Sequence, residues 1–347
     1  MKIKKMKISD YKILKDFECN FTDKDGDILN TVVIAGINGS GKTSILELIS
    51  NFFMKNRKLP SFKDYIEINI KNDGLLDSFN LIANNEAQTR INRKYKPTIT
   101  SSEVFQNDIK KISNDIQTFF LEFAKENENL SFKEIKEKAI NDINSTFENL
   151  ELVTKFKGLS DDIKQEPIFE NLNSDNIKLK DLSTGEQQLY IRALGFKMMK
   201  LKNSIILVDE PELSLHPNWQ NSILEIYQKI AKEGDNQLII TTHSPHIINS
   251  TSYKNLIFLI EENNKIVSKK FNSPPLDRDI NTIIKTLMGA EYFPKELKAL
   301  HERYKTFVEN GNFDSQEAKT LKEEILKHES ENSLFFQEMA FNIELMQ

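Results

Sequence analysis

The sequence predicts an α/β fold built around a parallel sheet, and three observations lead to this prediction. Four short apolar runs lack the polar–apolar alternation of a half-exposed strand, which is typical of strands buried on both faces; they cover 31–35, 204–208, 237–241 and 256–260. Segments with helical spacing separate these runs, as in parallel α/β sheets. The chain of 347 residues has only 11 glycines, yet three of them fall within the eight residues after the first run.

Composition places the chain among globular proteins. With 39% hydrophobic residues, 29% charged residues and a net charge of -5, it is neither a low-complexity chain nor a strongly basic nucleic-acid coat protein. Its one cysteine, Cys19, excludes internal disulfides and a cysteine-based zinc site, so a cytoplasmic location is expected. Neither a signal-peptide pattern nor an apolar run long enough to span a bilayer is visible, so we expect no membrane association.

The expected elements fall into four ranges. Residues 1–60 should form an N-terminal β lobe, the buried strand 31–35, the phosphate loop described below and a helix over 44–53. Residues 61–177 should be a mainly helical insertion, with a strand at 65–70 and apolar residues at three- and four-residue steps thereafter. Residues 178–276 return to alternating helices and strands, and 277–347 should form a helical tail.

A glycine-rich loop follows the first buried strand. Residues 36–43 read GINGSGKT and match G-x-x-x-x-G-K-[ST], a loop whose backbone N–H groups, with the N-terminus of the next helix, bind phosphate oxygens. A chance glycine-rich turn is the alternative, but the loop lies between a strand and a helix as phosphate binding requires. We expect the lysine to reach the β- and γ-phosphates and the threonine to ligate Mg²⁺. The predicted nucleotide-binding residues here are Asn38, Gly39, Ser40, Gly41, Lys42, Thr43 and Ser44.

Two carboxylates end the second buried strand. Asp209 and Glu210 follow the run 204–208, at the edge of an open α/β sheet where ligands bind. Asp209 is expected to hold Mg²⁺, and Glu210 to polarise a water for in-line attack on a γ-phosphate. A plain acidic turn is the alternative if this pair is considered without the phosphate loop.

Two more segments complete the pattern. Residues 182–188 read LSTGEQQ, in which Ser183 and Glu186 predict a capping box at a helix N-terminus. His243 ends another buried strand and, considered alone, would be a structural histidine. The phosphate loop, the LSxGE signature, the Asp-Glu pair and the strand-end histidine, in this order, resemble the ABC-type ATPases over residues 3 to about 260.

That resemblance implies an ABC-ATPase head, a P-loop NTPase sheet with an N-terminal β lobe, here with a compact helical insertion and a helical C-terminal tail. Two heads would close head-to-tail over ATP and Mg²⁺, so that Ser183, Gly185 and Glu186 of one head face the γ-phosphate held by the other. Thr43 and Asp209 would be the metal ligands. Glu210 would be the catalytic base, and His243 would hydrogen-bond the γ-phosphate and orient the water.

The sequences of these motifs are similar to those of the soluble RecF/SMC-like branch of these ATPases. Thr184 and Glu186 stand where transporter subunits favour Gly and Gln, and His216 stands where they carry an aspartate. The runs DEPELSLHPNWQ at 209–220 and THSPHI at 242–247 resemble the bacterial AAA_21-type ATPases of phage-defence operons, among them the Septu PtuA-type and retron-associated ATPases. The resemblance implies a regulatory ATPase with a partner effector, often a nuclease of the HNH type. The position of the family's glutamine loop stays open, and Gln88 and Gln106 are the two candidates.

Other functions stay open at this point. A RecF-like DNA repair ATPase is the main alternative, and a transporter subunit or a non-catalytic scaffold are others. Two basic clusters are either solvated faces or DNA contacts; they comprise Lys2, Lys4, Lys5, Lys7, Lys12 and Lys15, and Arg90, Arg93, Lys94 and Lys96. The apolar stripes of the tail either pack on each other or dock a partner or another protomer, in a homodimer or higher oligomer. His301 and His328 are expected at the surface.

Overall fold

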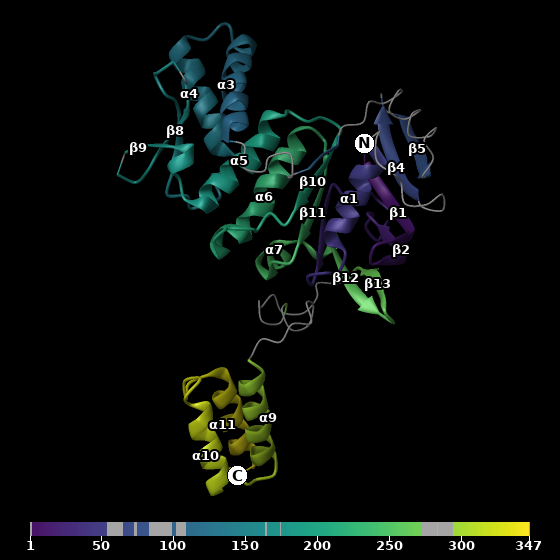
Figure 1. The fold of residues 1–347 in the computed structure, drawn as a ribbon, viewed down its shortest axis with the longest axis vertical. Helices are drawn as coiled ribbons and strands as arrows, with labels where there is room; N and C mark the ends of the chain where they lie inside the picture. The colour runs from purple at the N-terminus through teal and green to yellow at the C-terminus, as the bar shows by residue number, and fades with distance from the viewer. Residues whose placement is uncertain are drawn as a thin grey trace. The chain divides into compact units, whose positions relative to one another are not determined.

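The computed structural model describes residues 2–53, 65–72, 75–82, 99–101, 109–163, 165–173, 175–271, 283 and 294–346 (Figure 1). The chain divides into two compact units, Met1–Ile283 and Ile284–Gln347. The second unit therefore begins slightly later than the range 277–347 expected for the tail. None of the helices in the described ranges has the length and hydropathy that crossing a bilayer demands.

A six-stranded sheet forms the centre of the first unit. Its order is β13-β12-β3-β11-β10-β6, and all strands are parallel except β13. Their bounds are β3 (Thr31–Gly36), β6 (Ile99–Ser101), β10 (Ile205–Asp209), β11 (Gln237–Thr242), β12 (Leu256–Glu262) and β13 (Lys265–Lys269). The four predicted buried runs are confirmed as β3, β10, β11 and β12. Because parallel strands end at one edge, the phosphate loop, Asp209 and Thr242 all meet there.

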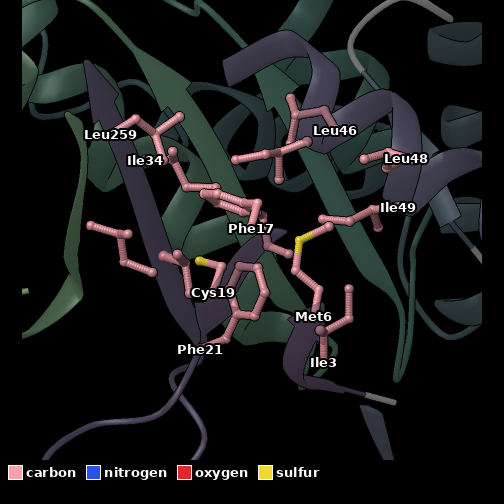
Figure 2. Packing of buried hydrophobic residues seen from close by; sticks show 14 of the residues in the cluster. Ile3, Met6, Phe17, Cys19, Phe21, Ile34, Leu46, Leu48, Ile49 and Leu259 are labelled. Carbon is pink, nitrogen blue, oxygen red and sulfur yellow. The ribbon is translucent and has the colours of Figure 1, made fainter. Parts of the chain in front are cut away.

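A four-stranded antiparallel sheet forms the N-terminal lobe, in the order β2-β1-β4-β5. The strands are β1 (Lys2–Tyr11), β2 (Leu14–Asn20), β4 (Tyr65–Asn72) and β5 (Leu75–Ile82). Side chains of β1 and β2 pack against helix α1 (Lys42–Phe53) and against one face of the central sheet. Figure 2 shows this core, where Met6 and Phe17 meet Ile49 of α1 and Ile34 of β3. The lobe and α1 thereby fix the position of the loop that joins β3 to α1.

Three helices surround the other functional segments. They are α5 (Thr184–Met198), α6 (Pro217–Glu233) and α7 (Pro245–Ser250), and short 3-10 turns precede α5 (η2, Leu179–Asp181) and β12 (η3, Tyr253–Asn255). Helix α6 lies on the side of β10 and β11 opposite α1 (Figure 1). Each of α5, α6 and α7 begins at a polar N-cap side chain that accepts a backbone N–H, namely Ser183, His216 and Ser244. These caps fix the loops that carry the motifs.

The described residues of 61–177 hold strands as well as helices, whereas the sequence predicted a mainly helical insertion. The range does contain α3 (Ile109–Glu126) and α4 (Phe132–Ser145), as the apolar spacing predicted. It also supplies β4 and β5 to the N-terminal sheet, β6 to the edge of the central sheet, and a small sheet of β7 (Lys155–Leu159), β8 (Pro167–Glu170) and β9 (Asn176–Lys178). Strands of three to five residues leave too short a pattern to separate them from loops.

The described part of the second unit contains α9 (Lys295–Glu309), α10 (Gln316–Ile325) and α11 (Leu334–Met346), as the tail pattern predicted. Their apolar stripes pack on one another around Tyr304, Leu321 and Phe336. The expectation that His301 lies at the surface was wrong: His301 is buried, stacks on Phe335 and contacts Glu329 with its Nε2 at 2.9 Å. His328 is exposed, as expected. The first part of the expected tail, 277–293, lies outside the described residues, apart from residue 283.

Candidate functional site

The phosphate loop has the backbone that its glycines allow. Gly39 and Gly41 have φ values of +83° and +92°, which residues with a Cβ rarely adopt. At Gly36 the constraint is space, because a Cβ there would lie 2.6 Å from the Ser40 Oγ and 3.0 Å from the carbonyl oxygen of Leu259. Each of the three glycines is therefore needed for the loop to curl tightly at the end of β3.

Lys42 lies within this curl. Its Nζ donates to the carbonyl oxygens of Gly36 and Ile37, at 3.0 Å each, and its side chain is only 5% exposed. Burial lowers the pKa of the Lys42 ammonium, and the nearby carboxylates, Glu210 first, partly oppose that shift. The Ser40 hydroxyl is buried without a hydrogen-bond partner among the described residues. A buried ammonium and an unpaired hydroxyl next to a helix N-terminus suit a phosphate group.

Thr43 and Asp209 meet directly. The Thr43 hydroxyl, in the first turn of α1, donates to the Asp209 Oδ2 at 2.9 Å, and the Thr241 hydroxyl donates to the Asp209 Oδ1. Hydroxyl and carboxylate oxygens are ligands that Mg²⁺ prefers. Both groups that the sequence assigned to a metal thus lie side by side, and their chemistry fits that ion.

Glu210 occupies a special backbone position. Its φ is +44°, in the left-handed region that costs energy for residues with a Cβ, and its N–H donates to the carbonyl oxygen of Thr241 at 3.0 Å. The side chain then reaches two predicted partners: its Oε1 lies 3.0 Å from the His243 Nδ1 and 3.9 Å from the Lys42 Nζ. The structure therefore brings the predicted base, the predicted sensor and the phosphate-loop lysine together.

Two further residues touch this group, and sequence reasoning did not single them out. Glu212 is 5% exposed, and its Oε1 accepts from the Thr242 hydroxyl and from the backbone N–H groups of His243 and Ser244. Arg192 of α5 donates from Nη1 to the Glu210 carbonyl oxygen at 3.5 Å. A third acidic residue two positions after the strand-end pair is a signal for Glu212, whereas nothing in the sequence marks Arg192.

The signature segment forms a separate group. Ser183 caps α5: its Oγ accepts from the Glu186 N–H at 3.3 Å and donates to the Glu186 Oε2 at 2.8 Å. The predicted capping pair is thus present, although the Glu186 carboxylate bonds the Ser183 hydroxyl. Glu186 is buried, and its Oε1 also accepts from the Thr154 hydroxyl. No hydrogen bond or ion pair within the described ranges joins Ser183, Gly185 or Glu186 to the phosphate-loop group.

Gly185 makes a close backbone contact. A Cβ at this position would lie 2.8 Å from the carbonyl oxygen of Ser214 and 3.3 Å from the Trp219 ring. Ser214 itself has a φ of +68°, in the loop between Glu210 and α6. The signature glycine is therefore required by packing within the head, whatever it contacts in trans.

The N-terminal basic cluster is largely neutralised. Lys2 pairs with Asp235 at 2.8 Å and Lys5 with Glu18 at 2.6 Å. Lys12 and Lys15 also pair with carboxylates, those of Glu47 and Asp10. These contacts favour the solvated-face interpretation over a DNA contact. The second cluster, Arg90 to Lys96, and both glutamine-loop candidates, Gln88 and Gln106, lie outside the described residues.

Fold and site together define a phosphate-loop head of the ABC/SMC-like fold class. The chain belongs to the AAA_21 family, described as "AAA domain, putative AbiEii toxin, Type IV TA system", whose profile matches residues 52–249, more than half of the chain. The matched range includes the signature, the acidic strand end and His243, and it begins after the phosphate loop.

Relatives and solved structures agree with this assignment. The "Retron Vc95 probable ATPase" of Vibrio cholerae is 28% identical over 45% of this chain and 33% of its own length. The "Septu protein PtuA" of Bacillus mycoides is 24% identical over 94% of this chain and 51% of its own length. The chain thus spans no more than about half of these relatives. The SMC head domain from Thermotoga maritima shares the fold, with a TM-score of 0.52 and 16% identity over 79% of this chain and 100% of that one.

Proposed function

We propose that this chain binds and hydrolyses ATP with Mg²⁺, and that the cycle regulates a partner effector in antiviral defence. The observation that supports hydrolysis best is the direct contact of Glu210 with His243 beside the buried Lys42. A carboxylate in this place can accept a proton from an attacking water, because it is partly exposed and adjoins the phosphate loop.

Binding would begin with an exchange of hydrogen bonds. The Lys42 ammonium now donates to two loop carbonyls, and it would donate instead to the β- and γ-phosphate oxygens. The Ser40 hydroxyl and the loop amides would supply further donors. Thr43 and Asp209 would hold Mg²⁺, which neutralises charge on the β- and γ-phosphates when bound. The adjacent residues Asn38, Gly39, Gly41 and Ser44 would contribute backbone and side-chain contacts.

The chemical step would use the pair at the strand ends. Glu210 would orient a water in line with the γ-phosphate and take its proton. His243 contacts Glu210 through Nδ1, so its Nε2 is the ring nitrogen left for a γ-phosphate oxygen. Both groups lie at the C-terminal ends of adjacent parallel strands, which holds them in a fixed relation.

Two heads would complete each site. Ser183, Gly185 and Glu186 stand at the N-terminus of α5, where N–H groups and the helix dipole favour an anion. Their hydrogen bonds and close contacts in the described part of the head lie around α5, away from the phosphate loop of the same head. We therefore assign them to the γ-phosphate of a second copy, in a head-to-tail dimer that ATP holds together and hydrolysis releases.

Phosphate release from purified protein tests the ATPase proposal. We expect slow, Mg²⁺-dependent hydrolysis by the wild type, and size-exclusion chromatography with light scattering should show an ATP-dependent shift from one to two copies. The matched control is Lys269→Ala, a lysine of β13 with an exposed ion pair to Glu262. Equal phosphate release by wild type and Lys42→Ala would show that the activity does not come from this site.

The effector proposal rests on the similarity to retron and Septu proteins. We propose a cytoplasmic complex with a nuclease, with the HNH type as the first candidate. Plating efficiency of phages on cells that carry this gene and its neighbours provides the test. Protection that requires both the neighbouring gene and Lys42 supports an effector switch. Hydrolysis stimulated by DNA, with no role for a neighbouring gene, would support the RecF-like repair function instead.

A further inference from the structure

We propose that Glu212 is a positioning residue that fixes the His243 imidazole against Glu210, an inference that rests on the proposed ATP hydrolysis. Glu212 lies two residues after the base, in the loop that leads to α6. It contacts the chain on both sides of the His243 side chain. Its carboxylate therefore joins the loop after β10 to the loop after β11.

One oxygen of Glu212 receives several donors. Its Oε1 accepts from the Thr242 hydroxyl at 2.7 Å, from the His243 N–H at 2.8 Å and from the Ser244 N–H at 3.1 Å. These donors replace part of the hydration that the buried carboxylate loses, so this arrangement determines where the turn at His243 lies. The Ser244 hydroxyl, which caps α7, also donates to the Gln220 Oε1 at 2.6 Å, so α6 supports the same turn.

The same oxygen faces the ring of His243. The His243 Nδ1 lies 3.3 Å from the Glu212 Oε1 and 3.0 Å from the Glu210 Oε1. Two carboxylates thus meet one ring nitrogen, while the backbone N–H of the same histidine is held by one of them. Fixing both the backbone and the ring leaves the imidazole little freedom to turn away from Glu210.

The alternative is a purely structural role, in which Glu212 holds the start of α7 in place. In that role Glu212 would stabilise the head without a particular effect on the orientation of His243. A positioning residue should change turnover through His243 and leave nucleotide affinity nearly unchanged, because among the described residues no hydrogen bond joins Glu212 to Lys42 or the phosphate loop. The two roles can therefore be separated by a double-mutant cycle.

The cycle compares Glu212→Ala, His243→Ala and the double variant, with Glu262→Ala in the exposed end of β12 as the matched control. We expect Glu212→Ala to lower kcat by about 10- to 100-fold, with KM and the Kd for ATP within about threefold of wild type. In the His243→Ala background the same change should cost less than about threefold. If the losses of kcat in the two single variants simply multiply in the double variant, the proposal is overturned. A loss of ATP affinity as large as the loss of kcat would also overturn it.

Glu212→Gln provides the rescue variant. Its amide oxygen can accept the same three donors, so we expect it to recover most of the rate lost in Glu212→Ala. A glutamine variant as slow as the alanine variant, in a protein that melts like wild type, would mean that the acceptor oxygen does not set the position of His243.

A measurement independent of hydrolysis separates failure of this proposal from failure of the proposed function. Hydrogen exchange of the His243 and Ser244 amides can be followed by NMR after labelling with ¹⁵N-histidine and ¹⁵N-serine. We expect both amides to be protected in the wild type and in Glu212→Gln, and to exchange at least about tenfold faster in Glu212→Ala. Unchanged exchange in Glu212→Ala would refute the positioning role. An inactive wild type with the expected exchange pattern would refute hydrolysis alone.

Discussion

The Nδ1 of His243 lies 3.0 Å from the Oε1 of Glu210, and the two residues follow adjacent parallel strands, β11 and β10. This contact forms within one copy of the chain, so Glu210 and His243 need no second copy to meet. What a second copy would add is charge stabilisation of the γ-phosphate from the α5 N-terminus. The two halves of the proposed mechanism can therefore be tested separately.

The first prediction concerns Lys42. Lys42→Ala should weaken ATP binding by about 10- to 100-fold or more, because charge-assisted hydrogen bonds contribute about 1.5–3 kcal/mol each. Isothermal titration calorimetry with ATP and Mg²⁺ measures this directly, and Lys269→Ala serves as the control. An unchanged Kd would show that the loop does not bind the nucleotide.

The second prediction concerns Glu210. Glu210→Gln should bind ATP as the wild type does but hydrolyse it about 10²- to 10⁴-fold more slowly, since the amide cannot take the proton. The two-copy form should accumulate with ATP, as seen by light scattering. The substitution keeps the left-handed backbone and the neighbouring Asp209, so a change in fold is not expected. Turnover at the wild-type rate would place the base elsewhere.

The third prediction concerns Ser183. Ser183→Arg should abolish the ATP-dependent two-copy form by placing bulk and charge where the second head closes. Because Ser183 is also the N-cap of α5, the change costs about 1 kcal/mol of stability as well. Ser183→Ala removes the cap without the bulk and is the matched control. Mixing Ser183→Arg with Lys42→Ala should restore at most one competent site per pair, and no rescue of hydrolysis above either variant alone would contradict the trans arrangement.

The fourth prediction concerns Cys19. Burial raises the pKa of the Cys19 thiol to about 12. The native protein should therefore react very slowly with Ellman's reagent at pH 8. The denatured protein should react with one equivalent of the reagent per chain. Because the pKa of Cys19 is raised in the folded protein, the buried thiol contributes fully to stability below about pH 9. That contribution to stability is lost as the pH rises towards 12, because only the unfolded chain then loses the proton. Rapid reaction of the native protein would contradict the burial.

The fifth prediction concerns the two units. A chain that ends at Ile283 should remain folded and bind ATP with the affinity of the full protein, because Lys42, Asp209 and Glu210 all lie before that point. The fragment 284–347 should melt as a helical unit, since the apolar stripes of α9, α10 and α11 cover each other. Circular dichroism and calorimetry check both pieces. Aggregation of the shorter chain would mean that the tail belongs to the core of the head.

Much of the central sheet could be predicted from sequence, because strands buried on both faces carry continuous apolar runs. The same is true of the residues that follow them: Asp209, Glu210 and His243 stand at strand ends, Lys42 ends the loop that follows β3, and strand ends of a parallel sheet meet. The three-residue strand β9 could not be found this way, since three residues do not establish a period. His301 was placed at the surface because a single histidine on a helix carries no signal of what stacks on it.

The site was predicted less completely than the sheet. Glu212 is part of the motif at 209–220, but the sequence does not show what it binds. It accepts from the backbone N–H groups of His243 and Ser244, which lie 31 and 32 residues further along the chain. Arg192 lies on α5 and donates to the carbonyl oxygen of Glu210, which follows β10. Such contacts follow from how loops fold over the sheet edge, and no spacing rule along the chain encodes them.

The contact of Gly185 with the Ser214 carbonyl has a consequence for the choice of variants. Replacing the signature glycine is an obvious way to ask whether ATP bridges two heads, but any added side chain would first push α5 away from its own loop. Loss of activity in such a variant would be ambiguous, because a damaged protomer and a blocked partner give the same readout. Heterodimers with one altered glycine and one intact head, tethered in a single polypeptide, would distinguish a defect that stays with its protomer from one that appears in the opposite site.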